Sequence, residues 1–584
     1  MKYVYNIIVS LFLILLPTKG LAQSALPFSE LKTYVNSGRD ATDVLNKALQ
    51  KCAELNKKQL ILPKGRYDFN LNNASKMGIK YVNLHHFTFD AQGSEFVFHG
   101  EGMAVVINLC DDLTLKNFSI DWEHPFTYQV KTVRSTKDYL DIMINSSHPS
   151  YTIENGKLFF ISENWKKPAA SWNINLYDAK NHEIAYKTHD NPLGNIFEQF
   201  SVSLNDSTVR LYGKTPLEPE IGSIAVIHTD VSHYDAITIE ISKDILLQNI
   251  PIYYSPGRGV LAQHVENITL DNTAACTNSR KQRVFSTTFD NAHFNNCKGL
   301  IKIQNCKPTG MGDDAINIHG RYYKIIRKHN DSQVEVVVPD ASISKDEELW
   351  VLPRRNHQRI DTLTVIESKE TAKAPNYRTF ILTFNKKLPR FIKEGDCLES
   401  KTWTPSVIIR NCTFGKKNRA RGILVTTPQK VSIRDNYFRT AGAAILIEGD
   451  MGMWMESGGC RNITIENNIF EDCLTSGSEN GTSGEWGEAI ITVTPQETVS
   501  FNRNNPYHRG IRIRNNIFKT FDIPILHARY ADIEFSNNKL TKTDSYAPYA
   551  YQQSVLFLES CPIINEYGNS WNDFPVKAKR ISIK

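Results

Sequence analysis

The C-terminal part of this 584-residue chain repeats one short pattern of alternating apolar and polar residues. The pattern begins at Val407-Ile-Ile-Arg-Asn-Cys-Thr-Phe414 and recurs at Val431–Phe438, Ile463–Phe470, Ile511–Phe518 and Ile533–Leu540. Each copy has the two-residue periodicity of a strand and then reaches Asn or Asp, which tolerate a left-handed backbone at a turn. A unit of about 24 residues cannot bury its own apolar face, so neighbouring units must stack.

This stacking predicts an all-β fold, a right-handed parallel β-helix with rungs about 4.8 Å apart. The same pattern starts earlier in the chain at Leu113, Ile245, Ile268 and Ile301. The longest offset, from Ile463 to Ile511, fits either two rungs or one rung with a long loop.

Two gaps interrupt the repeat, at 126–230 and 321–400. Because both contain longer alternating segments, they predict two inserted antiparallel β-barrel-like domains. The β-helix would then comprise a cap and first rungs at 23–125, central rungs at 231–320 and C-terminal rungs at 401–584. Helical spacing of apolar residues from Asp43 to Leu55 predicts a helix that covers the exposed edge of the first rung.

The first residues have the pattern of a secretory signal. Met1 and Lys2 precede an apolar run from Val4 to Leu16, and small residues lead to Gln23. We therefore expect residues 1–22 to be a cleaved signal peptide and the protein to be exported, to the periplasm or outside the cell. The alternative is an N-terminal anchor. No later stretch approaches 18 apolar residues, so we expect no membrane span in the mature chain.

Charge and cysteine content exclude two classes of site. The formal net charge is +6, and removal of Lys2 and Lys19 leaves +4, which is too mild and too scattered to indicate nucleic-acid binding. The ten cysteines show no zinc-ligand spacing, so we expect no metal site. Cys306 and Cys412 stand at repeat positions that suit small buried residues, which predicts mostly free core cysteines.

Three aspartates form a candidate acid/base site. Asp290 precedes Asp313 by 23 residues, close to one repeat, so the two could lie on consecutive rungs. Gly310 and Gly312 give the backbone freedom to turn Asp313 and Asp314 toward one site. The alternative is a solvated Asp-Asp turn. Glycosidase carboxyls stand about 6.5–9.5 Å apart in inverting enzymes and about 5–5.5 Å apart in retaining ones, and the spacing permits both.

Three motifs resemble one family. They are Phe-Asp-Asn around Asp290, Gly-Met-Gly-Asp-Asp-Ala-Ile-Asn around Asp313, and Ser255-Pro-Gly-Arg-Gly-Val260. The chain resembles the α-1,3-galactosidases of glycoside hydrolase family 110, known from gut Bacteroides. The resemblance implies a β-helix with two barrel inserts and an inverting mechanism with no metal or other cofactor. The implied substrates are glycans of blood group B type, or linear ones, with terminal α-1,3-linked galactose.

By the same resemblance, Asp290, Asp313 and Asp314 are the catalytic residues. The arrangement is also similar to polygalacturonases, in which a single Asp precedes an Asp-Asp pair. That similarity suggests Asp313 as the general acid, with Asp290 and Asp314 orienting the attacking water. The chain departs from polygalacturonases at Asn317-Ile-His319-Gly320 and has no clear Arg-Ile-Lys motif for a uronate, so a neutral sugar fits better.

Candidate substrate-binding residues lie close to these aspartates or in segments that break the repeat, as loops on a rigid scaffold do. They are His319, Glu448, Trp454, Glu485 and Trp486. The acids could bind sugar hydroxyls and the tryptophans could cover a sugar face; the alternatives are solvated loop acids, loop packing and a structural histidine. Arg258, between two glycines, could contact substrate or bridge rungs.

Other functions remain open at this stage. A polygalacturonase-like hydrolase is one. A polysaccharide lyase on the same fold would use Ca²⁺ and yield an unsaturated product, whereas a non-catalytic glycan-binding β-helix would release no sugar. The sequence does not decide the range of linear and branched substrates, or the oligomeric state, although the two inserts offer surfaces for a homodimer.

Overall fold

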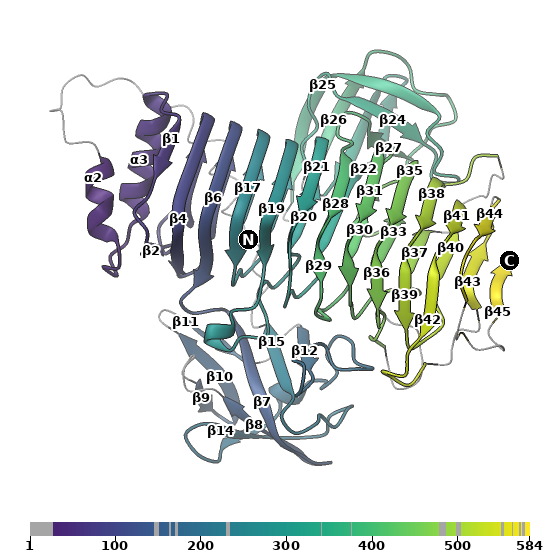
Figure 1. Ribbon diagram of the computed structural model, residues 1–584. Coiled ribbons are helices and arrows are strands. Elements are labelled where there is room, and N and C mark those ends of the chain that lie inside the picture. Colours follow the sequence, from purple (N-terminus) through teal and green to yellow (C-terminus); the bar gives the residue numbers. More distant parts are fainter. Residues whose placement is uncertain are drawn as a thin grey trace.

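The computed structural model describes residues 27–144, 151–162, 165–169, 173–228, 234–339, 341–374, 377–477, 486–497, 504–549, 554–562, 564–571, 574 and 579–583. The expected signal peptide at 1–22 lies outside them. These residues form a parallel β-helix, as predicted, with one inserted domain on each side of it (Figure 1). Across this part of the chain, no helix has the length and apolar character needed to cross a membrane.

Two long parallel sheets run the length of the β-helix. The first sheet contains β1 (Gln59–Ile61), β4 (His85–His99), β6 (Asp111–Trp122), β17 (Lys243–Ile252), β19 (Glu266–Ala275), β21 (Lys298–Gln304), β28 (Ser406–Arg410), β31 (Lys430–Arg434), β35 (Asn462–Glu466), β38 (His508–Arg514), β41 (Ala531–Ser536) and β44 (Ile564–Tyr567), with β2 (Arg66–Asn70) paired to β4. Because β35 pairs directly with β38, the longest offset in the repeat is one rung with a long loop.

The second sheet carries the candidate site. Its strands are β3 (Met77–Val82), β5 (Met103–Asn108), β16 (Ile237–Glu240), β18 (Val260–Gln263), β20 (Ala292–Asn295), β22 (Ile316–Asn330), β30 (Ile423–Val425), β33 (Ile445–Gly449), β37 (Ile491–Pro495), β40 (Leu526–Arg529), β43 (Ser554–Glu559) and β45 (Lys579–Ile583). A third, shorter sheet consists of β29 (Thr413–Phe414), β32 (Tyr437–Phe438), β36 (Ile469–Glu471), β39 (Ile517–Thr520) and β42 (Lys539–Lys542).

The repeat residues stack on their equivalents in the next rung. The Asn or Asp at the turn has positive φ, between 54° and 58°, in all five copies. Phe414, Phe438, Phe470 and Phe518 stack with ring centroids 4.8, 4.9 and 4.7 Å apart. In the same rungs the buried Asn436 and Asn468 form a hydrogen-bonded ladder, with Asn436 Nδ2 donating to Asn468 Oδ1 at 3.1 Å. These contacts explain why the pattern recurs.

The first inserted domain follows β6. A six-stranded antiparallel sheet and a three-stranded one enclose a separate core that includes Tyr128 and Phe160. The strands are β7 (Thr127–Ser135), β8 (Tyr139–Ile144), β9 (Tyr151–Glu154), β10 (Lys157–Ser162), β11 (Trp165–Pro168), β12 (Asn173–Tyr177), β13 (Ser201–Ser203), β14 (Thr208–Tyr212) and β15 (Ile224–His228), with the 3-10 turn η2 (Ile196–Glu198).

The second inserted domain is a closed antiparallel barrel that begins in the outer half of β22. Each strand pairs with two others in the order β22, β23, β26, β25, β24, β27 and back to β22. The added strands are β23 (Gln333–Val338), β24 (Glu348–Leu352), β25 (Asp361–Lys373), β26 (Arg378–Phe384) and β27 (Cys397–Ser400). The two insertions project from opposite sides of the β-helix (Figure 1).

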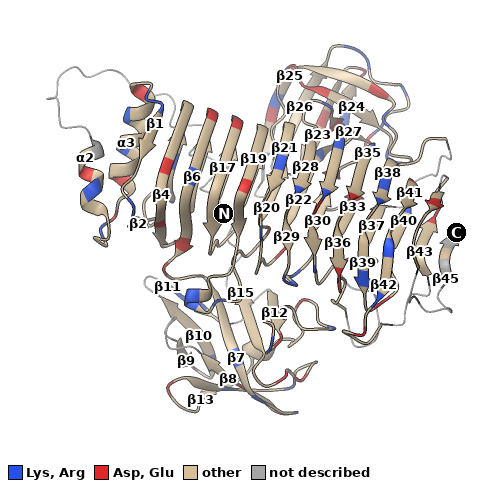
Figure 2. Ribbon diagram, viewed as in Figure 1, with Lys and Arg blue, Asp and Glu red and all other residues tan. Residues whose placement is uncertain are grey.

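Helix α3 (Thr42–Glu54) covers the N-terminal end of the β-helix and is preceded by α2 (Pro27–Leu31) and the 3-10 turn η1 (Lys32–Tyr34). Its buried apolar residues are Val44, Leu45, Ala48, Leu49 and Cys52, as the sequence pattern predicts. All ten cysteines are free, and eight of them are buried. Along the rungs, Lys and Arg are interspersed with Asp and Glu (Figure 2).

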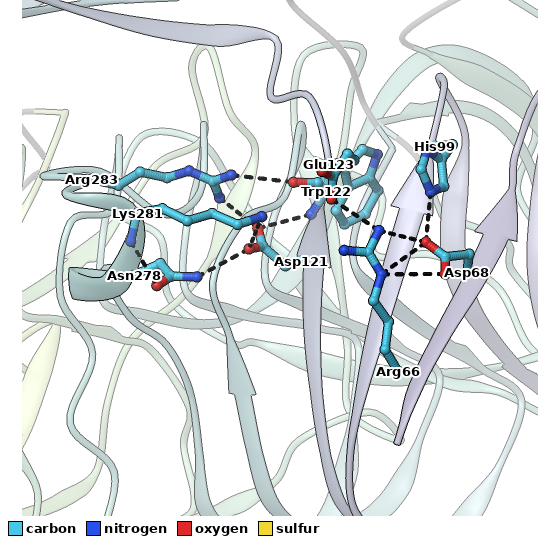
Figure 3. A network of polar contacts seen from close by, with 9 residues as sticks. All are labelled: Arg66, Asp68, His99, Asp121, Trp122, Glu123, Asn278, Lys281 and Arg283. Carbon is cyan, nitrogen blue, oxygen red and sulfur yellow. Dashed lines mark hydrogen bonds and ion pairs between the residues drawn. The ribbon is translucent and has the colours of Figure 1, made fainter. Parts of the chain in front are cut away.

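A polar network joins the early rungs to the turn η3 (Ser279–Lys281), which follows β19 (Figure 3). The buried Asp121 accepts from Arg283 Nη1 at 2.5 Å and from Asn278 Nδ2 at 3.1 Å, and its carboxylate lies 3.0 Å from Lys281 Nζ. Because Asp121 is almost fully buried, these partners compensate a charge that water cannot reach.

Candidate active site

Five charged residues occupy one equivalent position in successive rungs of the second sheet. The first residues of β16, β18, β20, β22 and β30 are paired with one another across the sheet. The residue two positions before each strand is Asp235, Arg258, Asp290, Asp314 and Arg421, respectively. The column therefore alternates in charge except at the step from Asp290 to Asp314, where two carboxylates meet.

The structure brings the three predicted aspartates together: each of Asp290, Asp313 and Asp314 offers a carboxylate oxygen within 4.8 Å of the others. The residue in register with Asp290 is Asp314, however, not Asp313 as the sequence spacing suggested. The glycines before the pair make the bend possible. Gly310 has φ of 77°, and a β-carbon at Gly312 would clash with the Thr288 carbonyl oxygen.

Two of these carboxyls are buried against each other. The Asp314 backbone N–H donates to Asp290 Oδ1 at 3.1 Å, and Asp314 Oδ1 accepts from Arg421 N at 3.0 Å and Nε at 2.9 Å. Burial raises the pKa of Asp314 to about 6, although Arg421 opposes the shift. Burial and the neighbouring Asp313 and Asp314 carboxylates raise the pKa of Asp290 well above its usual value.

The third carboxyl faces outward. The side chain of Asp313 is 30% exposed, compared with 4% for that of Asp314. Asp313 Oδ1 lies 2.7 Å from Arg419 Nη1, and Arg419 also pairs through two nitrogens with Asp190, at 2.9 and 2.7 Å. Asp190 comes from the first inserted domain, so that domain helps to hold the outward carboxyl in place.

Two histidines lie behind the carboxylates. His293 Nδ1 is 2.6 Å from Asp290 Oδ2, and His293 Nε2 is 2.8 Å from His319 Nε2. His319 Nε2 is also 3.3 Å from Glu456 Oε1. Glu456 lies on the short strand β34 (Glu456–Ser457), which pairs with β22. Burial places the predicted binding residue His319 inside this network, and its contact with substrate stays a prediction.

The rim of the site holds two further predicted binding residues. Glu448 lies on β33, where burial raises its pKa to about 7 against the opposing effect of Arg421. The Trp454 side chain is largely uncovered, since the residue is 58% exposed. Its backbone is fixed, because Trp454 N donates to Asp450 Oδ2 at 2.7 Å and Trp454 O accepts from Arg321 Nη1 at 2.7 Å.

The segment around Trp486 differs from the expected loop platform. Trp486 is only 4% exposed, packs into the main core, and has the Arg419 guanidinium 5.6 Å from its ring centroid. Trp486 therefore packs against Arg419, and little of its ring face is accessible to a sugar. Glu485, the other predicted residue here, lies outside the described residues.

Sequence reasoning missed five residues of the site: Asp190, His293, Arg419, Arg421 and Glu456. Four of them are distant from the Asp pair along the chain: Asp190 lies in the first inserted domain, and Arg419, Arg421 and Glu456 follow the second. Aligning the strands β16, β18, β20, β22 and β30 would have indicated Arg421, because a charged residue stands two positions before each of these five strands.

Two groups of side chains have the atom types of metal ligands. They are the carboxylates of Asp290, Asp313 and Asp314, and the cluster of His293, His319 and Glu456. In each group these atoms lie within 4.8 Å of one another. In the aspartate cluster, Arg419 and Arg421 already pair with two of the three carboxylates. In the other cluster, the histidine nitrogens are 2.8 Å apart, whereas a tetrahedral ion with bonds of about 2.0–2.1 Å would hold them about 3.3 Å apart. Both geometries are those of hydrogen-bonded networks.

Comparisons with known proteins place the chain among named relatives. The domain family described as "GLAA-B beta-barrel domain I" matches residues 127–225. The chain is 33% identical to the α-1,3-galactosidase B of Bacteroides thetaiotaomicron, over 92% of this chain and 90% of the relative. It is 32% identical to the α-1,3-galactosidase A of Shewanella woodyi, over 88% and 85%, respectively. Among solved structures, a surface adhesin of Streptococcus pneumoniae aligns with a TM-score of 0.41 and 11% identity, covering 94% of this chain and 92% of the adhesin.

Proposed function

The chain belongs to the α-1,3-galactosidase family, and on this premise we propose that it is an exo-acting, inverting glycoside hydrolase. Its substrates would be glycans of blood group B type, and linear glycans, that end in α-1,3-linked galactose. The observation that carries the proposal is the cluster of three carboxylates: Asp290 and Asp314 from successive rungs of the column, and Asp313 beside them. Two carboxyls with different roles are what glycoside hydrolysis requires.

Asp313 would be the general acid. It is the most exposed of the three side chains, so it can reach the glycosidic oxygen of a sugar bound above the sheet. Its proton would pass to that oxygen as the bond to the galactose anomeric carbon breaks. Arg419 holds the Asp313 carboxyl from the side and remains paired with the carboxylate that the reaction leaves behind.

Asp290 and Asp314 would activate the attacking water. Asp314 ionises at about pH 6, so at neutral pH it can accept a hydrogen bond from water and orient it. Attack from the face opposite the leaving group would convert the α-linkage into β-galactose. The proton lost by water would enter the Asp290–Asp314 pair, and exchange with solvent would return a proton to Asp313.

The stereochemical outcome needs its own test. The nearest oxygens of the three carboxylates lie within 4.8 Å. Inverting enzymes separate the two carboxyl groups by about 6.5–9.5 Å and retaining enzymes by about 5–5.5 Å. Because a nearest-oxygen distance is a lower bound on the separation of two groups, this spacing does not select inversion. The proposal of inversion rests on the arrangement of one Asp before an Asp-Asp pair.

Substrate binding would use the rim. The exposed indole of Trp454 offers a flat apolar surface for the apolar face of galactose, or of the next sugar. Glu448, close to Arg421, would accept hydrogen bonds from sugar hydroxyls when it is ionised. We also propose that the chain is exported through its signal segment, which the N-terminal sequence of the protein purified from its host would test by starting near Gln23.

The decisive experiment is proton NMR of the purified chain from residue 23 with blood group B trisaccharide and with galactosyl-α-1,3-galactose. Initial release of β-galactose supports the proposal, and initial α-galactose would show retention instead. The matched controls are Asp313→Asn and Asp314→Asn, which should bind but release no sugar. Absence of galactose from both substrates, together with an ultraviolet-absorbing product from uronate polymers, would replace the proposal with a lyase.

A further inference from the structure

Asp290 is the first residue in a series of short contacts that leads away from the exposed Asp313 carboxyl. Asp290 Oδ2 lies 2.6 Å from His293 Nδ1, and His293 Nε2 lies 2.8 Å from His319 Nε2. At the far end, His319 Nδ1 lies 2.8 Å from the backbone oxygen of Gly320. Each of these distances is that of a hydrogen bond, so each needs one proton between its two atoms.

The last contact of this series, between His319 and Gly320, determines where the protons lie. A carbonyl oxygen only accepts, so His319 Nδ1 carries the proton toward Gly320. If both imidazoles are neutral, His319 Nε2 is then an acceptor, and His293 Nε2 must donate to it. His293 Nδ1 is left as an acceptor, and its partner Asp290 must be protonated to donate.

A second arrangement contains the same number of protons. The Asp290 proton moves to His293 Nδ1 while the His293 Nε2 proton moves to His319 Nε2, which leaves Asp290 ionised and His319 an imidazolium. The carboxylate of Glu456, 3.3 Å from His319 Nε2, faces the new charge. Burial favours the first arrangement at rest, because it raises the pKa of Asp290 and lowers the pKa values of His293 and His319.

We propose that His293, His319 and Glu456 form a proton relay that lets the buried Asp290 act as a base. The inference rests on the proposed function and deepens it. When Asp290 takes a proton from the attacking water, its own proton passes to His293 Nδ1, and the His293 Nε2 proton passes to His319. One O–H bond of water breaks and one N–H bond of His319 forms; Asp290 ends protonated again, and His293 ends neutral but protonated at Nδ1 instead of Nε2. His293, His319 and Glu456 are positioning residues, because they act through Asp290.

Other charged groups face the relay from neighbouring rungs and from the loop before β34. They are Arg258, Arg321, Arg421, Asp313, Asp314 and Asp450. Arg258 and Arg321 disfavour an imidazolium, whereas the Glu456 carboxylate favours it. Glu456 is therefore the residue whose charge decides whether the second arrangement can form. Burial raises the pKa of Glu456 to about 7, so this charge appears near neutral pH.

The first test needs no substrate. In protein with ¹⁵N-labelled histidine, the resting arrangement gives a neutral His293 protonated at Nε2 and a neutral His319 protonated at Nδ1. Asp290→Asn should leave both tautomers unchanged, because an amide N–H replaces the carboxyl O–H as the donor to His293. If the His293 proton moves between the ring nitrogens on this substitution, Asp290 is ionised at rest and the relay is overturned. This result stands whether or not the chain hydrolyses galactosides.

The second test is kinetic, on α-1,3-galactoside hydrolysis. His293→Gln and Glu456→Gln should each lower kcat about 10²-fold with KM changed less than about 3-fold, the size expected for losing a general base. Glu456→Gln should also move the acid limb of the kcat profile to lower pH, because ionisation of Glu456 near pH 7 no longer contributes to it. A raised KM with kcat retained would show instead that Glu456 binds sugar, and it would overturn the relay.

A matched control comes from another histidine–carboxylate pair. His99 Nε2 lies 3.0 Å from Asp68 Oδ1 in the network of Figure 3, away from the rung column of charged residues, so His99→Gln should leave kcat and its pH profile unchanged. Glu456→Asp, which keeps the charge, should recover part of the kcat lost in Glu456→Gln. Retention of one equivalent of a transition-metal ion, with loss of activity on chelation, would show that the histidines are ligands and would also overturn the relay.

Discussion

Asn468 should be a sensitive position of the asparagine ladder in the C-terminal rungs. Its side chain is 1% exposed and makes four hydrogen bonds. It donates to Ile433 O at 2.9 Å and Asn516 Oδ1 at 3.1 Å, and it accepts from Asn436 N at 3.0 Å and Asn436 Nδ2 at 3.1 Å. In Asn468→Leu, which keeps a similar shape, all four bonds are lost.

Two of the four partner groups keep another bond after the substitution. Asn516 Oδ1 still accepts from the backbone N–H of residue 468 at 2.9 Å, and Asn436 Nδ2 still donates to Ile409 O at 3.0 Å. The Asn436 N–H loses the bond described and stays buried, whereas the Ile433 carbonyl lies within the parallel ladder of β31 with β35, which the substitution leaves in place. At about 1–3 kcal/mol for one such buried group, the free energy of opening these rungs should fall by about 2 kcal/mol.

Hydrogen exchange followed by mass spectrometry measures this local free energy, because exchange of buried amides reports opening of individual rungs. A loss of about 2 kcal/mol corresponds to exchange about 30-fold faster in the peptides that cover β31 and β35. The control is Asn467→Gly at the exposed neighbouring position, where φ is 56° and glycine fits. Equal exchange rates in the two variants would refute the assignment of stability to the ladder.

Three more predictions concern the site and its scaffold. Asp313→Ala should lower kcat about 10²–10⁴-fold on natural glycans but far less on aryl galactosides, whose leaving group needs no acid; equal losses would contradict the acid role. Arg421→Gln removes a charged hydrogen bond of about 1.5–3 kcal/mol, so the pKa of Asp314 should rise from about 6 by about 1–2 units. Because the base must be ionised, the acid limb of kcat/KM should move to higher pH, and an unchanged limb would exclude this pairing. Arg283→Met should destabilise the chain by about 3 kcal/mol in urea unfolding because it removes the closest partner of the buried Asp121, and a change below about 1 kcal/mol would contradict that view.

The β-helix was predictable because its constraints are local and repeated. The position of Asn468 is Asn in four of the five copies, since the amide both donates and accepts along the helix axis; the first copy has Cys412 there. The turn residue before it must tolerate positive φ, which also restricts the amino acid type. Both requirements leave marks at a regular spacing, and the aromatic stack from Phe414 to Phe518 adds a third.

The partners of the clustered carboxylates leave no such mark. Arg421 is 107 residues from Asp314 along the chain, because the second inserted domain separates two rungs that are adjacent in space. In the sequence, nothing distinguishes His293 from the other residues of its strand. Only its neighbours in the folded structure determine which ring nitrogen carries the proton. Trp486 resembles a loop tryptophan in sequence, and only the packing of its segment against the core reveals that the ring is buried.

The pairing of Asp190 with Arg419 gives the first inserted domain an influence on chemistry that it does not perform. Arg419 contacts the outward carboxyl of Asp313 on one side and the inserted domain on the other. A change in how that domain docks on the β-helix would therefore shift the Asp313 carboxyl, the proposed proton donor, without altering a single residue of the carboxylate cluster. In directed evolution or natural drift, activity should thus respond to substitutions at the contact between this domain and the β-helix. Mutagenesis confined to the proposed sugar-binding residues would miss them.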